Sequence, residues 1–167
     1  KAYLFRPVPV ALAFVIGGVL ILLVDRREDR AVLHEPDEVT PLTALKLGLW
    51  QALALFPGTS RAAATIIGGM LMGMSRRLAT EYSFFLAIPT LMAATAYELL
   101  KHWRAFDTGS GTGPVLLSAV VSFVTAFLAV RALLRYIGSH NFAVFAWYRI
   151  AFGLLIIVTA SMGWIRW

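Results

Sequence analysis

The sequence predicts an all-α polytopic membrane protein with four transmembrane helices and one re-entrant helical hairpin. Hydrophobic residues make up 59% of its 167 residues, and the mean hydropathy is +0.76, whereas a soluble domain is usually about 45–50% apolar. A bilayer-spanning helix needs about 20 residues, and four apolar stretches approach or exceed that length. A fifth apolar region is divided by a Pro-Gly turn into two arms, each too short to cross. The four long stretches are residues 7–24, 82–100, 114–137 and 142–164, and the divided region is residues 44–74.

The composition excludes several classes of protein. There are no cysteines, so disulfides and thiolate metal sites are ruled out. The net charge of +6 indicates, in a membrane chain, loops that face an anionic cytoplasmic leaflet. No basic stripe with interleaved aromatic residues is present, so we expect no nucleic-acid partner. The length suits one membrane domain over residues 1–167.

The first predicted span, residues 7–24, carries no charge. Its central Gly17-Gly18 pair indicates close packing against another helix. The composition then changes to DRREDRAVLHEPDEVT, residues 25–40, which we interpret as an aqueous loop with a solvated charge run.

The hairpin prediction depends on the turn between the two short arms of residues 44–74. An arm of about 13 or 14 residues is only about 20 Å long as a helix, against a hydrocarbon core of about 30 Å. Pro57 breaks the first arm, Gly58 permits a sharp turn, and Thr59 or Ser60 can cap the second arm. The excess of Lys and Arg on one side is larger if the hairpin is re-entrant, with its mouth on the cytoplasmic side.

The predicted tip has the chemistry of an anion site. The start of the second arm presents free N–H groups and the positive end of a helix dipole. Ser60 adds a hydroxyl, and Arg61 adds a fixed charge with a planar fork of donors. We therefore expect Gly58, Thr59, Ser60 and Arg61 to bind a phosphate group. The alternative is a single kinked spanning helix with Arg61 snorkelling to the interface.

Four further polar residues have both a functional and a structural interpretation. Thr65 either reaches the tip or bonds back to its own helix, and Gln51 either supports the tip or faces a neighbouring helix. Glu81 either contacts Arg61 or forms a polar cavity wall, or it is stabilised at the start of its own helix by the helix dipole. Arg149, inside the last span, either snorkels or faces the bundle interior and helps to hold an anion.

Other phosphate and hydrolase chemistries find no matching motif. There is no Gly-Lys-Ser/Thr of a P-loop and no HExxH or similar cluster for a metal. The three histidines lie in or beside predicted loops, and no Ser–His–Asp set is recognisable. The remaining candidate for phosphate chemistry is the Ser60 hydroxyl with Arg61 at the start of the second arm.

These residues resemble the undecaprenyl-diphosphate phosphatase family of bacterial membranes, of the bacitracin-resistance type. The resemblance centres on PGTSRAAATIIGGMLMGMSRRLATEYSFFLAIPTLMAATAYELLK, from Pro57 to Lys101, and extends to the Tyr148-Arg149 pair. It implies a fold of two inverted repeats whose re-entrant tips meet at a site open to the periplasm of the inner membrane. It also implies hydrolysis of the lipid substrate undecaprenyl diphosphate to undecaprenyl phosphate and phosphate, for cell-wall synthesis. The family's Ser-Arg pair falls on Ser60 and Arg61, and its threonine on Thr65.

The sequence departs from the family pattern in two ways. Ala62 stands where members usually have a second serine. The chain also resembles only the C-terminal part of a member, without the repeat that carries a glutamate-rich motif. The resemblance implies a divalent cation, Mg²⁺ or Ca²⁺, whose ligands we expect in that other part and not in this chain. The oligomeric state stays open, with a homodimer as one candidate.

Two functions use the same predicted anion site. In the phosphatase interpretation, Arg61 binds the phosphates and stabilises developing charge, while Ser60 either binds phosphate or acts as a nucleophile. Thr65 positions the diphosphate or lines the pocket. The alternative is a polyprenyl-phosphate transporter, because broken helices at the midplane also build transporters.

Overall fold

The computed structural model describes residues 7–102 and 112–162 and is entirely helical apart from turns, loops and one isolated bridge. This confirms the all-α fold class. The elements in chain order are α1 (Pro7–Asp25), η1 (Glu28–Arg30), η2 (Pro36–Glu38), α2 (Pro41–Gln51), η3 (Ala52–Leu55), α3 (Arg61–Leu71), α4 (Arg76–Lys101), α6 (Thr112–Ile137) and α7 (Ala143–Ser161).

Four of these helices, α1, α4, α6 and α7, are long and apolar enough to cross a membrane by length and composition. They lie over the four predicted spans with shifted ends. The largest shift is in α4, which begins at Arg76 instead of residue 82 because the Ser75 hydroxyl accepts a hydrogen bond from Leu78 N at 3.2 Å. The last predicted span runs to residue 164, where residues 163 and 164 lie outside the described part.

The two arms of the predicted hairpin are α2 with η3 and then α3. The α-helices are each 11 residues long, which is about 16 Å and too short to cross alone. The first arm loses α-helical geometry at Gln51, earlier than the predicted break at Pro57, and tightens into η3. Phe56, before the proline, is extended with φ −77° and ψ 126°, as the proline ring requires of the residue that precedes it.

The second arm ends in a glycine-dependent motif. Gly73 has φ +90°, its N–H donates to Met70 O at 3.1 Å, and the next N–H, of Met74, donates to Gly69 O at 3.0 Å. This Schellman arrangement satisfies carbonyl groups that the helix end would leave free. It turns the chain directly into α4.

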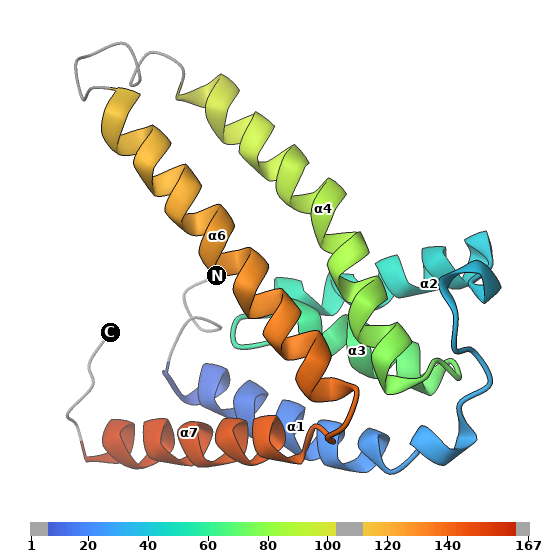
Figure 1. Cartoon of the computed structure of the whole chain (residues 1–167). Helices are drawn as coiled ribbons and strands as arrows, with labels where there is room; N and C mark the ends of the chain where they lie inside the picture. Colours follow the sequence, from blue (N-terminus) through green and yellow to red (C-terminus); the bar gives the residue numbers. More distant parts are fainter. Residues whose placement is uncertain (1–6, 103–111, 163–167) are drawn as a thin grey trace.

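The closest helix pair is α1 with α7, which lie antiparallel and side by side (Figure 1). A Cβ added at Gly18 would lie 2.8 Å from Ala146 O, and one added at Gly153 would lie 2.9 Å from Ala11 O. Only glycine permits these backbones to approach so closely. The predicted close packing at Gly17-Gly18 is therefore present, and its partner is α7.

The segment after α1 is not only a solvated charge run. Asp25 belongs to α1, and its Oδ1 lies 2.7 Å from Arg76 Nε. Its Oδ2 accepts a hydrogen bond from Phe142 N at 3.2 Å, and Glu28 Oε2 accepts one from Arg76 N at 2.7 Å. Asp25 thus contacts the starts of both α4 and α7, and Glu28 contacts the start of α4.

The buried core lies at this same end of the molecule. It gathers side chains from α1, the hairpin, α4, α6 and α7, namely Ile21, Val24, Leu47, Ile67, Met70, Met74, Leu78, Ala79, Ile137, Phe142 and Ala146. Away from it, α4 and α6 form an antiparallel pair that extends from the other helices (Figure 1). The apolar side chains of this extension are mostly exposed, as expected of surfaces that face lipid or further protein.

Candidate active site

The tip of the hairpin is a tight turn whose conformation follows from its residues. Gly58 has φ +86°, and a Cβ there would lie 2.6 Å from Val10 O of α1. Thr59 N donates to Phe56 O at 3.1 Å. Ser60 is the N-cap of α3, since its hydroxyl accepts a hydrogen bond from Ala63 N at 3.3 Å. The first N–H groups of α3 after this cap have no carbonyl of a preceding helical turn to bond.

Arg149 comes to this tip from α7. Its Nη2 donates to Gly58 O at 3.3 Å, and its Cζ lies 4.8 Å from the centre of the Phe14 ring, a cation–π distance. Its Nε is buried without a hydrogen-bond partner among the described residues. A Cβ at Gly17 would lie 2.8 Å from Nη2, so this glycine leaves room for the guanidinium. The structure therefore agrees with the second interpretation of Arg149, in which its side chain faces the bundle interior.

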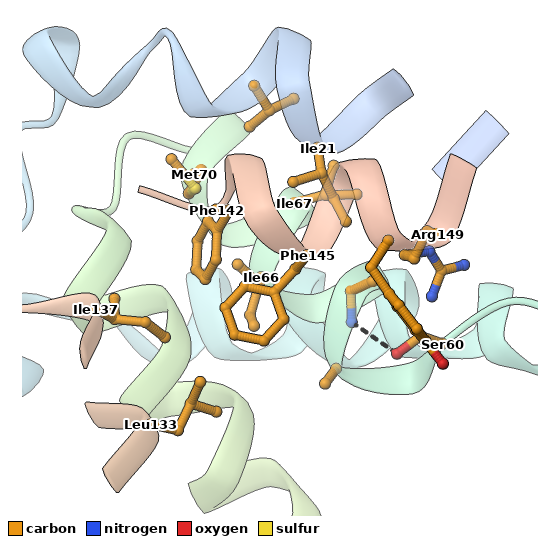
Figure 2. Close-up of a pocket in the computed structure, with 14 residues that line it drawn as sticks. Ile21, Ser60, Ile66, Ile67, Met70, Leu133, Ile137, Phe142, Phe145 and Arg149 are labelled. Carbon is orange, nitrogen blue, oxygen red and sulfur yellow. Dashed lines mark hydrogen bonds between the residues drawn. The ribbon is translucent and has the colours of Figure 1, made fainter. Parts of the chain in front are cut away.

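A cavity of about 270 Å³ opens beside the tip. Its walls are almost wholly apolar and come from α1, α3, α6 and α7, with Ile21, Ile66, Ile67, Met70, Phe142 and Phe145 among them. Ser60 and Arg149 lie together at one end (Figure 2). The cavity therefore has the character of a site for an amphiphile, with an apolar body and a polar end.

Arg61 is the first residue of α3 and is half-buried. It does not line this cavity, and no carboxylate in the described ranges forms an ion pair with it. Glu81, one candidate partner, pairs instead with Arg77 on its own helix, with Arg77 Nε 2.9 Å from Glu81 Oε1. Glu81 therefore stabilises α4 in this structure.

Thr65 lies behind the tip between α3 and α4 and is 2% exposed. Its hydroxyl lies 3.1 Å from both Arg61 O and Ala62 O, and 2.7 Å from the Ser83 hydroxyl. Of the two interpretations, the hydroxyl bonded back to its own helix is the one observed. Ser83, itself 8% exposed, was missed by the sequence reasoning, although a serine within an apolar span was a usable signal.

Gln51 lies where the first arm changes from α2 to η3. Its Nε2 donates to the Thr90 hydroxyl of α4 at 3.4 Å, next to Pro89, while its Oε1 is buried without a partner among residues 7–102 and 112–162. Gln51 thus faces a neighbouring helix, one of the two interpretations. It connects the hairpin to the proline-containing part of α4.

A divalent cation does not fit the residues that the structure describes. No group of three or more His, Asp or Glu side chains gathers among them to hold a metal ion. The cavity beside the tip has no carboxylate in its lining. We therefore derive no chemical step through a metal.

The fold and site define a polytopic helical membrane protein with a broken-helix tip that adjoins an apolar cavity. The family model described as bacitracin resistance protein BacA matches residues 1–155. The chain therefore belongs to the BacA family of bacitracin resistance proteins.

Curated relatives are similar over the whole chain. The undecaprenyl-diphosphatase of Laribacter hongkongensis is 54% identical over 171 residues, undecaprenyl-diphosphatase 1 of Burkholderia lata is 55% identical over 172, and undecaprenyl-diphosphatase 2 of Rhodospirillum rubrum is 56% identical over 167. Each alignment includes 100% of this chain, and the chain spans 61–62% of the length of these relatives.

Proposed function

We propose that the protein contributes to the hydrolysis of undecaprenyl diphosphate to undecaprenyl phosphate and inorganic phosphate. The observation that carries the proposal is the apolar cavity with Ser60 and Arg149 at its polar end, beside the free N–H groups of the hairpin tip. A polyprenyl diphosphate has the matching form, an anionic head on a long apolar chain. The names of the relatives supply the reaction.

In the proposed reaction, water breaks the anhydride P–O bond between the two phosphates, and inorganic phosphate leaves. Arg149 and the first N–H groups of α3 would meet the phosphate oxygens at the polar end of the cavity. Arg61 lies outside the lining but directly follows Ser60, and its guanidinium would turn toward the bound phosphates and stabilise the charge that develops on them. The Ser60 hydroxyl accepts from Ala63 N, and no described His or carboxylate hydrogen-bonds to it. Because a serine nucleophile needs an adjacent base, we assign Ser60 to phosphate binding. Thr65 would position the start of α3 from behind.

Two further parts of the proposal concern the surroundings of the site. We propose that a divalent cation, Mg²⁺ or Ca²⁺, takes part through ligands in the portion of the longer relatives that this chain does not match. We place the protein in the bacterial inner membrane with the site open to the periplasm, where a recycled lipid carrier would be dephosphorylated.

The transporter alternative receives no support from the relatives, whose names describe diphosphatases.

Phosphate release from undecaprenyl diphosphate by the full protein tests this function. Removal of one preorganised donor to a developing charge slows catalysis by about 100- to 1000-fold, so Arg61→Ala should lower kcat by that factor. Arg77→Ala is the matched control, because Arg77 makes an exposed ion pair on α4 away from the tip. Near-normal release by Arg61→Ala, or an equal loss in both variants, would contradict the assignment of Arg61.

A further inference from the structure

A second hollow, of about 430 Å³, lies at the end of α6 beside the turn into α7. Two arginines of α6, Arg131 and Arg135, line it. The other lining residues are Leu128, Ala132 and Tyr136 of α6 and Ser139 and His140 of the turn. It shares no lining residue with the cavity beside the hairpin tip. The proposed phosphatase reaction therefore makes no use of it.

The two arginines have no counter-charge in the part of the chain that the structure describes. Neither forms an ion pair there, and no acidic residue lines the hollow. They are four residues apart on α6, so they project from the same side of the helix, where like charges at this spacing are unfavourable. Both side chains line the same hollow, so an anion bound there would lie near both and relieve the repulsion.

The remaining lining residues, Tyr136, Ser139 and His140, carry polar groups. The His140 ring stacks on Tyr136 with centroids 4.4 Å apart and an interplanar angle of 9°. The Ser139 hydroxyl lies 2.8 Å from His140 Nδ1. These contacts keep polar groups beside the two arginines, where a bound headgroup would meet them.

An apolar track leads away from the arginines. Leu128, Val124 and Val121 follow one another on α6 at spacings of four and three residues, and they are 59%, 49% and 55% exposed. Residues at these spacings share one face of a helix. A ligand with its phosphate between Arg131 and Arg135 could therefore place an alkyl chain along this face, which an inorganic phosphate could not use.

We propose that this hollow binds an anionic glycerophospholipid of the surrounding bilayer, with the headgroup phosphate between Arg131 and Arg135 and one acyl chain along α6. Basic pockets at the ends of membrane helices recognise anionic headgroups in this way. The bidentate geometry of guanidinium suits phosphate oxygens. The site is distinct from the phosphatase site and does not depend on it.

Binding of phosphatidylglycerol to the full detergent-purified protein, followed by native mass spectrometry, tests the proposal. Each basic side chain near an anionic lipid contributes about fivefold in affinity, so the double variant Arg131→Gln/Arg135→Gln should bind about 30-fold more weakly. Phosphatidylcholine, which is zwitterionic, should bind weakly to both proteins. The variant should keep the thermal unfolding midpoint of the wild type, because neither side chain is buried.

The matched control is Arg26→Gln/Arg27→Gln, which removes two exposed arginines after α1 and should leave phosphatidylglycerol binding unchanged. Equal weakening in both double variants would show general surface attraction and overturn the proposal. Displacement of the lipid by inorganic phosphate at comparable concentration would assign a free-phosphate site instead. The proposal would also be overturned if Arg131→Gln/Arg135→Gln bound the lipid as well as the wild type does, whether or not this variant changed its oligomeric state.

Discussion

At the scale of single residues, Thr65 is buried behind the hairpin tip and does not line the cavity beside it. A hydroxyl has one proton to donate, so the consistent arrangement has Ser83 donating to Thr65 and Thr65 donating to the carbonyls of Arg61 and Ala62. Thr65→Val would leave the Ser83 hydroxyl buried without this partner. We expect the free energy of unfolding to fall by about 1–3 kcal/mol, measured by denaturation in detergent micelles.

A double-mutant cycle with Ser83→Ala separates this structural role from a direct one. If the two hydroxyls act mainly on each other, the double variant should lose less stability than the sum of the two single variants. Phosphate release should follow stability in the series. Loss of phosphate release in Thr65→Val at unchanged stability would instead place Thr65 in contact with the substrate.

The features of the site that could be predicted are those that depend on residues adjacent in the sequence. The cap at Ser60 and the turn at Gly58 follow from residues adjacent in sequence, and both occur as expected. The direction of Arg149 could not be decided, because it depends on α1 passing beside α7 with Gly17 leaving space. The Thr65–Ser83 contact likewise joins two helices, and no local pattern encodes their relative rotation.

At the scale of the elements, the hairpin turn depends on one glycine. Gly58→Ala would place a Cβ 2.6 Å from Val10 O at a residue with φ +86°. A non-glycine residue held in such a conformation costs about 1–3 kcal/mol, and the clash adds to this cost. We expect a less stable protein with strongly reduced phosphate release, because the start of α3 must move. Unfolding in micelles and a release assay measure the two effects.

Gly48→Ala is the control for this prediction, because a Cβ at Gly48 in α2 meets nothing within 4 Å. Alanine in a helix interior is favoured over glycine by about 0.5–1 kcal/mol, so this variant should be as stable as the wild type or more so. A Gly58→Ala protein that behaves like Gly48→Ala would mean that the tip relaxes freely around the added methyl group.

The elements were predicted well where hydrophobic length decides and less well at their ends. Apolar stretches predict the positions of the four long helices. The second predicted span starts only at residue 82, because hydropathy along the chain places the charged Arg76 and Arg77 outside it. In the structure Arg76 is paired with Asp25, which allows the helix to begin there. The pairing is between segments, and hydropathy along the chain does not contain it.

At the scale of the whole molecule, α1 and α7 pack side by side, whereas α4 and α6 join the other helices mainly at one end. The core and the Asp25 contacts lie there, while the far parts of α4 and α6 extend from the other helices (Figure 1). Hydropathy predicted that these helices are apolar, but an apolar helix surface is equally suited to lipid and to protein. The arrangement therefore depends on the few polar and glycine contacts that have a unique geometry.

Asp25 is the polar contact on which this arrangement depends most. Its side chain is 9% exposed and that of Arg76 is 16% exposed, and the carboxylate contacts both Arg76 of α4 and Phe142, the residue before α7. Because this pair is partly buried, removal of one partner should cost about 3 kcal/mol, the lower end of the range for buried ion pairs, since the other charge stays mostly out of water. Asp25→Ala should lose stability of this size and loosen both helices, as measured by unfolding and by hydrogen exchange at the starts of α4 and α7.

The exposed pair Arg77–Glu81 is the control for Asp25, since Glu81→Ala should change stability by only about 0–1 kcal/mol. Asp25→Asn separates the two contacts of the carboxylate, because an amide oxygen still accepts from Phe142 N while the charge that pairs with Arg76 is lost. In Asp25→Asn we therefore expect slow hydrogen exchange to persist at the start of α7, while exchange at the start of α4 becomes faster. If Asp25→Ala were no more harmful than Glu81→Ala, the helices would be held by apolar packing and the glycine contacts of α1 and α7 alone.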